Sequence, residues 1–336
     1  MSGHKPDNTL TRDRLKLFEN IAFRRLRLIF KIIISAAFLV YVFSIVDLQS
    51  FKKALFEIRP GYYLISLGIL LVNSCILAFK FKIILAPTPI RQTLLSLLKI
   101  NFISRFYSLF FTAAMGQGVV RWYQTTKNQE GKLSFLPVLI FERASFIIVL
   151  CFFILLSWFF LTSIESRMLG KGILPFALAG LMIPLVLYFI SMEVYRSPTP
   201  DRHNGHNAHK KNYWQKVRPL FDSFAIFKHQ TDLAFASLGV AFLWHFAYLL
   251  RVFFLFGAVN IETSLAQLCW MGSLVLFVQL LPVSFNGIGL REGIYAYLFK
   301  LAGMPFEKGI LVGSLFFTQM LIASAVGGAV VILSRK

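Results

Sequence analysis

The sequence has little charge, and acidic charge is especially scarce. Only 15% of its 336 residues are charged, with 15 Asp and Glu against 35 Lys and Arg, whereas 57% are hydrophobic. The mean hydropathy is +0.68. This composition excludes a soluble globular domain and predicts a polytopic membrane protein. The basic residues lie mostly beside apolar runs, where they set orientation and attract anionic lipid, and no domain for binding nucleic acid is expected.

Cysteine is also scarce, and its placement argues against disulfides and metal clusters. Cys75, Cys151 and Cys269 lie in separate apolar runs without a CxxC spacing. The three histidines of 203–209 lie among Pro, Asn, Gly and Lys, where ordered ligation of a metal is not expected. Because the chain has no Walker-type phosphate loop, direct use of ATP is not expected either. We therefore predict no metal and no cofactor.

Long apolar runs predict an all-α, polytopic membrane helical bundle. A spanning helix needs roughly 20 apolar residues, which gives about seven or eight transmembrane helices. Two further stretches, 93–118 and 283–301, are apolar but interrupted by glycine and charge, and they predict re-entrant or broken segments. The clear candidate spans are 27–46, 62–80, 135–161, 173–192, 233–258, 264–282 and 308–333.

The distribution of basic residues predicts the topology. Residues 1–26 and the loop 193–232 are rich in Lys and Arg, so both are expected in the cytoplasm, with 27–336 forming a single integral membrane domain. If 93–118 crossed the membrane completely, the basic loop would lie outside. Charge therefore favours re-entry of 93–118 and predicts that both termini are cytoplasmic, in the inner or plasma membrane of the cell.

The topology of the last third follows from the same counting. Helix 264–282 is expected to run inward, 290–301 to return outward, and 308–333 to end inside. In the alternative, 283–301 is a re-entrant loop beside another span.

Residues 281–293, with the sequence LPVSFNGIGLREG, place proline, asparagine, two glycines and an Arg-Glu pair directly after an apolar run. Broken backbone and ionised side chains at membrane depth persist only where protein or a water-filled cavity satisfies them. This segment is therefore predicted to form part of a binding site.

A second segment resembles the first. Residues 116–121 (GQGVVR) and 287–291 (GIGLR) both read Gly-x-Gly followed by an arginine, at the end of an apolar run in opposite halves of the chain. Paired glycine-interrupted segments indicate an internal repeat, here an inverted repeat with a central site. Coincidence is the alternative, because the match is short and the chain has 21 glycines.

These motifs carry a resemblance to a known family. Residues 281–293 resemble the late Pro-x-Ser-x-Gly-Gly-x-Gly-x-Arg-Glu motif of the lysylphosphatidylglycerol synthase/flippase-like transmembrane domain family. Residues 116–123 are similar to its Gly-x-x-Val-Arg-x-Tyr signature, and Glu142-Arg143 to the Glu-Arg pair at the head of its next helix. The chain departs from the pattern at Asn286, where glycine is common, and at Gln117-Gly118, where an acidic or Gly-Asp pair is common.

The resemblance implies a flippase-like membrane domain with two re-entrant segments, associated with moving or presenting lipids that have anionic or glycosylated head groups. Full-length aminoacyl-phosphatidylglycerol synthases of this family add a large soluble transferase domain. Here the sequence stops at Lys336, shortly after the final apolar run, so we do not expect lipid aminoacylation by this chain.

The chemistry of the two segments suits a phosphodiester head group. The guanidinium groups of Arg291 and Arg121 can each bind two phosphate oxygens, and glycine-exposed amides add partial positive charge. Ser284 and Asn286 can bond a glycerol or sugar hydroxyl. The predicted substrate-binding residues are Arg291, Arg121, Gly116, Gly118, Ser284, Asn286, Gly287 and Gly289.

Other polar residues favour structural or proton-coupling roles. Pro282 would end the preceding helix, and Glu292 would orient an arginine or take up a proton. Glu142 and Arg143 are expected in interhelical ion pairs, and such pairing is also the alternative for both predicted arginines. His245 and Arg251, six positions apart in one span, face different sides of a helix, so no joint role is expected.

The primary hypothesis is a lipid transporter that moves a phospholipid, glycolipid or polyprenyl-phosphate-linked lipid between leaflets. One alternative is a membrane-embedded enzyme that modifies a lipid head group, with Glu142, Glu292 and His245 available for acid-base chemistry. The sequence offers no catalytic constellation for it. A second alternative is a lipid-binding scaffold for a synthase. The expected partners are membrane lipids and a lipid-synthesising enzyme.

Overall fold

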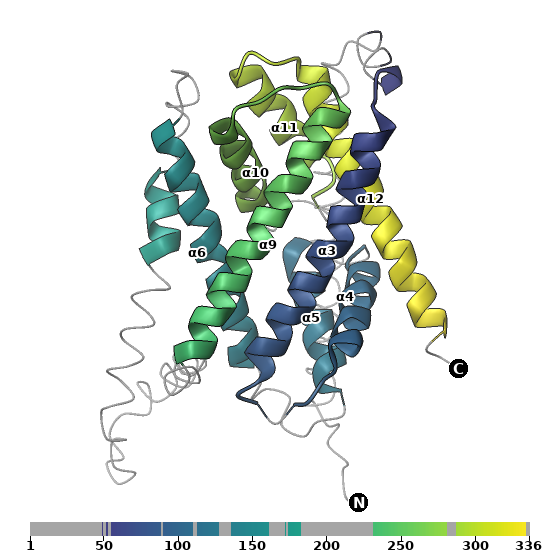
Figure 1. Cartoon of the computed structure of the whole chain (residues 1–336), viewed down its shortest axis with the longest axis vertical. Helices are drawn as coiled ribbons and strands as arrows, with labels where there is room; N and C mark the ends of the chain where they lie inside the picture. The colour runs from purple at the N-terminus through teal and green to yellow at the C-terminus, as the bar shows by residue number, and fades with distance from the viewer. Residues whose placement is uncertain are drawn as a thin grey trace, which may run out of the picture.

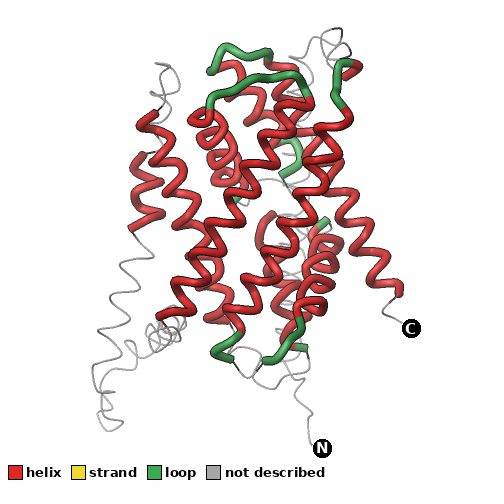
Figure 2. Tube along the Cα trace, viewed as in Figure 1, coloured by secondary structure: helices red, strands yellow, loops and turns green. Residues whose placement is uncertain are grey.

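A computed structural model describes residues 55–88, 90–109, 113–127, 136–160, 174–182, 231–280 and 287–333, together with residues 49, 52 and 172. Over these residues the chain is helical, with short connections and no strand (Figures 1 and 2). This confirms the predicted all-α bundle. The helices are α3 (Pro60–Leu85), α4 (Leu94–Ser108), α5 (Ala113–Thr126), α6 (Leu136–Phe160), α9 (Thr231–Ala258), α10 (Leu265–Gln279), α11 (Leu290–Leu301) and α12 (Phe306–Leu333).

Local sequence signals start several of these helices. Pro60 occupies the first turn of α3, where its missing N–H costs no hydrogen bond. The hydroxyl of Thr93 accepts a hydrogen bond from the backbone N–H of Ser96 and caps α4. Ser264 and Gln267 form a reciprocal capping box at the start of α10.

Among the described residues, four helices are long and apolar enough to cross a membrane: α3, α6, α9 and α12. The 26 residues of α3 extend about 39 Å, more than the roughly 30 Å of hydrocarbon. These helices confirm the predicted spans at 62–80, 135–161, 233–258 and 308–333. The predicted span 27–46 lies outside the described residues, and only the helical segment 174–182 of 173–192 is described.

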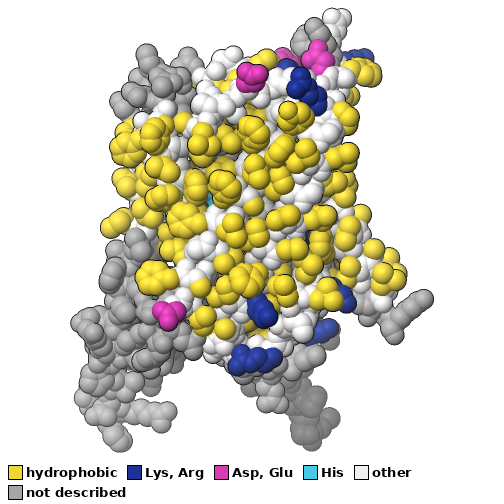
Figure 3. Space-filling model, viewed as in Figure 1, with side chains coloured by type: hydrophobic (Ala, Val, Ile, Leu, Met, Phe, Trp, Pro, Cys, Tyr) yellow, Lys and Arg dark blue, Asp and Glu magenta, His cyan; other side chains and the backbone are white. Residues whose placement is uncertain are grey.

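The outer surface suits a lipid environment. Large side chains such as Phe159, Phe235 and Phe246 are 72%, 73% and 61% exposed. On the face shown in Figure 3, hydrophobic side chains form a broad band across the middle of the molecule, and charged side chains gather at its two ends. The end at which α3 finishes and α4 starts is called the lower end here, and the opposite end the upper end (Figure 1).

The remaining four helices are short and form two hairpins. Helices α4 and α5 pack together in the lower half of the bundle, and α10 and α11 in the upper half (Figure 1). The predicted interruption of the stretches 93–118 and 283–301 is confirmed, because short helices replace a continuous span there, whereas their re-entry into the membrane stays a prediction. The predicted spanning helix 264–282 is wrong, because α10 has 15 residues and extends only about 22 Å. It ends at Gln279, just before the proline and glycine of the 281–293 segment.

The chain is built from two repeats of one helical pattern, long, short, short, long: α3 to α6 and α9 to α12. A constant spacing of 171 residues separates their parts. Helix α3 begins at residue 60 and α9 at residue 231. Helix α4 begins at 94 and ends at 108, and α10 begins at 265 and ends at 279. The same spacing separates the two Gly-x-Gly pairs, at 116 and 118 and at 287 and 289. The glycine motifs therefore occupy corresponding positions.

The two repeats run in opposite directions. At one end of α3 the N–H of Arg59 donates to the carbonyl of Ala258 at 2.9 Å, and further along Ser66 Oγ donates to the carbonyl of Arg251 at 3.2 Å, so α3 and α9 are antiparallel. Helix α4 packs on α12, and its counterpart α10 packs on α6. Each hairpin thus rests on the last long helix of the other repeat, and the two hairpins enter from opposite ends (Figure 1).

Close packing of the lower hairpin on α12 depends on a glycine. A Cβ at Gly327 would overlap the carbonyl group of Phe102 on α4, whereas a Cβ at Gly239, on α9, would meet nothing within 4 Å. We expect Gly327→Ala to lower the thermal unfolding temperature in detergent, because α4 must move away. Gly239→Ala should leave it unchanged or raise it, since alanine favours a helix by up to about 1 kcal/mol. Equal shifts in the two variants would contradict this packing.

Candidate functional site

Three arginines from three different helices lie close together in the interior of the bundle. They are Arg105 of α4, Arg251 of α9 and Arg291 of α11, named here the central arginine group. Arg251 experiences Coulombic repulsion from both of the others. Its guanidinium carbon lies 4.5 Å from the centroid of the Phe316 ring, and that of Arg291 lies 5.7 Å from the same centroid. Both hairpins therefore contribute a cation to one region.

The central arginine group has only neutral hydrogen-bond partners. Within the part of the chain that the structure describes, none of the three guanidinium groups forms an ion pair with a carboxylate. The buried Nε of Arg105 has no hydrogen-bond partner in that part of the chain. Buried cations without a paired carboxylate are costly, and such residues inside a membrane bundle mark a candidate binding site. The side-chain bonds are Arg251 Nε to Gln319 Oε1 (2.7 Å), Arg291 Nη2 to Gln279 Oε1 (3.0 Å) and Arg105 Nη2 to Ser74 Oγ (3.3 Å).

The turn before α11 positions Arg291. Gly287 and Gly289 both have φ of +78°, a conformation that side chains with a Cβ rarely adopt. A Cβ on Gly287 would also lie 3.2 Å from Arg291 Nη2 and from Gln279 Oε1. Glycine therefore allows the chain to turn and allows the guanidinium group to approach the end of α10.

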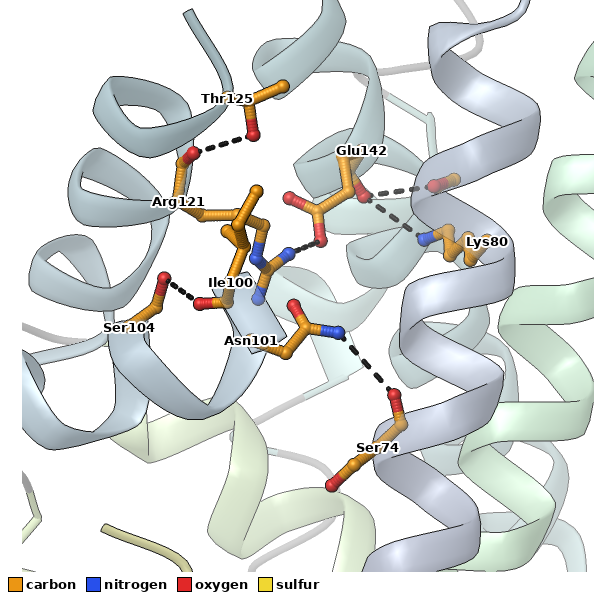
Figure 4. Close-up of polar contacts among 9 residues, drawn as sticks. Ser74, Lys80, Ile100, Asn101, Ser104, Arg121, Thr125 and Glu142 are labelled. Atoms are coloured by element: carbon orange, nitrogen blue, oxygen red, sulfur yellow. Dashed lines mark hydrogen bonds and ion pairs between the residues drawn. The ribbon is translucent and has the colours of Figure 1, made fainter. Parts of the chain in front are cut away.

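A second polar cluster lies in the lower half, around Arg121 of α5. Arg121 Nη1 forms an ion pair with Glu142 Oε1 of α6 at 2.8 Å, and the two residues are 3% and 7% exposed. Lys80 of α3 donates to the backbone carbonyl of Glu142 at 3.3 Å. Figure 4 shows the Arg121 and Lys80 side chains pointing toward Glu142 from two sides. This lower ion-pair cluster joins the hairpin to both long helices of its repeat.

Glycine also shapes the lower ion-pair cluster. A Cβ on Gly118 would lie 3.0 Å from Nη2 of Arg143, so the absence of a side chain lets this guanidinium group lie against α5. Gly116 lies two residues earlier in the same helix. The earlier Gly-x-Gly pair is therefore helical, whereas the later one forms a turn.

The structure separates the two predicted arginines. Arg291 belongs to the central arginine group, but Arg121 faces Glu142, and Arg105 lies near enough to repel both Arg121 and Arg251. Glu292 is 6% exposed, and its Oε2 has no hydrogen-bond partner in the described part of the chain. The predicted residues Pro282, Ser284 and Asn286 lie outside the described residues.

Sequence reasoning missed several members of the site. Arg105 was not among the predicted substrate-binding residues, and Arg251 was considered only for a joint role with His245. His245 instead bonds Ser273 Oγ at 2.9 Å. Gln279 and Gln319, which hold two of the arginines, were not considered. A usable signal was present, since each is a polar residue inside an apolar run.

Two inverted helical repeats, two hairpins of short helices and four apolar helices long enough to span a bilayer define a multi-pass helical membrane protein. The chain belongs to the lysylphosphatidylglycerol synthase TM region family, whose model matches residues 28–328. This confirms the family resemblance and covers nearly the whole chain, so the protein is a lipid-related membrane domain of that type. No curated protein and no solved structure matches the chain.

Proposed function

We propose that this protein moves a lipid with an anionic head group between the two leaflets of the membrane. The observation that supports it is the central arginine group, whose guanidinium groups are hydrogen-bonded, among the residues that the structure describes, only to neutral side chains. A phosphodiester would supply the missing negative charge, and its oxygens match the paired N–H donors of a guanidinium group. The head group would displace Gln279 and Gln319 from Arg291 and Arg251, while the acyl chains stay in the hydrocarbon.

The inverted repeat supports a transport mechanism. In transporters built from inverted repeats, the substrate lies near the bilayer midplane, and one repeat moves against the other to expose it alternately to each side. Here the hairpin α4–α5 would open the central arginine group toward the lower end, and α10–α11 toward the upper end. The lower ion-pair cluster would hold the lower hairpin closed, because it ties α5 to α6 and α3.

Charge at the two ends supports an orientation. The described residues near the lower end include the exposed cations Lys82, Arg91 and Lys127. By the positive-inside rule this end faces the cytoplasm, which is compatible with cytoplasmic termini in an inner or plasma membrane. The transported class comprises phospholipids, glycolipids and polyprenyl-phosphate-linked lipids. An enzyme that makes such a lipid on the cytoplasmic side is the expected partner.

Reconstitution tests the proposal. In proteoliposomes, leaflet exchange of fluorescent phosphatidylglycerol should clearly exceed exchange in protein-free vesicles, and exchange of fluorescent phosphatidylcholine should be slower. Mass spectrometry of the recovered lipids should find the probe chemically unchanged. Exchange equal to that of protein-free vesicles would refute transport, and a new lipid species would favour an enzyme that modifies the head group.

A further inference from the structure

A cavity of about 400 Å³ lies at the lower end of the bundle, where α3 passes into α4. Two cations line it, Lys82 from the last turn of α3 and Arg91 from the connection. The described residues that line it include no acidic side chain. The cavity therefore combines concave shape with positive charge at one end of the bundle.

The donors in this cavity are partly uncommitted. Nη1 of Arg91 donates to the carbonyls of Ala86 and Thr88 at 3.2 Å each, which fixes the connection. Its Nε and Nη2 have no hydrogen-bond partner among the described residues. Lys82 has no hydrogen-bond or ion-pair partner within the described residues. Thr93 caps only the N–H of Ser96 in the first turn of α4. The neighbouring amides add partial positive charge, to which an anion is attracted.

The rim of the cavity is apolar on the membrane side. Leu94 and Leu95, in the first turn of α4, are 42% and 62% exposed. Leu85, Ile90 and Leu97 line its inner wall. A lipid could therefore place a charged head group against Lys82 and Arg91, with its acyl chains beside the leucines.

The corresponding corner of the other repeat lacks this charge. With the spacing of 171 residues, Thr93 corresponds to Ser264, and both cap a helix in the same way. Arg91, however, corresponds to Glu262, and Lys82 to Phe253. The two repeats thus share the capped start of the short helix, but only the first repeat has two cations at these corresponding positions. Structural needs common to both repeats do not explain them.

We infer that this cavity binds the head group of an anionic phospholipid from the lower leaflet before it reaches the central arginine group. The inference rests on the proposed function, since it supplies the lipid for that transport. Helix α4 connects the two places. Its first turn borders the cavity, and Arg105 lies 11 residues further along, about 17 Å at 1.5 Å per residue.

Photo-crosslinking of the full chain in phosphatidylcholine nanodiscs tests this. A phosphatidylglycerol probe with a photoreactive acyl chain should label residues 82–97 more strongly than the matching phosphatidylcholine probe. Lys82→Gln should reduce this labelling about fivefold, the effect of one cation near a membrane surface, and Lys82→Arg should restore it. Lys127→Gln, which removes an exposed lysine outside the cavity, should leave it unchanged. Excess inorganic phosphate should not compete.

Other outcomes would overturn the inference. Equal labelling by the two lipids, or equal losses in Lys82→Gln and Lys127→Gln, would mean that the cavity does not select a head group. Competition by inorganic phosphate would identify a site for a soluble anion instead. Failure of the proposed transport alone would give a different result. The wild-type protein would then show labelling at 82–97 but no leaflet exchange. Arg291→Gln should slow exchange by about tenfold or more and retain the labelling.

Discussion

Arg291→Gln and Arg251→Gln should each slow leaflet exchange of an anionic lipid by about tenfold or more. A hydrogen bond to a charged group contributes about 1.5–3 kcal/mol, which corresponds to a factor of roughly 10 to 100. Glutamine removes the charge but keeps a polar side chain that can bond Gln279 or Gln319, so the fold should persist. The measurement is the exchange rate of fluorescent phosphatidylglycerol in proteoliposomes.

Matched variants separate this effect from general charge loss. Arg59 is exposed at the upper end, where it contacts the ring of Tyr62, and Arg59→Gln should exchange lipid at the wild-type rate. Arg291→Lys should fall between wild type and Arg291→Gln, because lysine keeps the charge without the paired donors. Wild-type rates in both glutamine variants of the central arginine group would remove the basis of the proposed site.

Glu142→Ala should cause the largest loss of stability. The carboxylate pairs with Arg121 in the interior at 2.8 Å, and its removal leaves a buried guanidinium group without a counterion. Breaking one side of a buried ion pair costs about 3–5 kcal/mol. We expect a correspondingly lower unfolding temperature in detergent, measured by the change in helical circular dichroism.

A double-mutant cycle provides the control. Arg121→Ala removes the buried guanidinium group that Glu142→Ala leaves without a counterion. The destabilisation of the Arg121→Ala/Glu142→Ala protein should therefore be smaller than the sum of the destabilisations of the two single variants. Thr125→Val removes only a hydroxyl that bonds the Arg121 carbonyl, and it should change stability little. Additive effects of the two ion-pair variants would show that the pair does not hold α5 against α6.

The long spans were predictable because length and hydropathy alone decide them. The apolar run 233–258 matches α9 (Thr231–Ala258) within two residues at its start. The end of α10 was harder to predict, since the apolar run continues past Gln279 to residue 282. Only the packing of α10 and α11 as a hairpin shows that the helix stops there. The repeat was visible in the glycine pairs, and the 171-residue spacing extends it to whole helices.

The partners of the arginines were not predictable from the motifs. Arg121 and Arg291 follow similar glycine pairs, but the repeat spacing relates Arg121 to Glu292 and Arg291 to Val120. The two arginines are thus one position out of register and face different neighbours. Glu142 meets Arg121, whereas its counterpart Gly313 packs against the backbone of Glu292. A difference of one residue on a helix, about 100°, decides which arginine gains a carboxylate.

A density map of the protein in nanodiscs that contain phosphatidylglycerol tests the central claim most directly. We predict density for a phosphate group in contact with Arg251 and Arg291, with Gln279 and Gln319 displaced from these guanidinium groups. Lipid density confined to the outer hydrophobic belt, with both arginines still bonded to the glutamines, would contradict it.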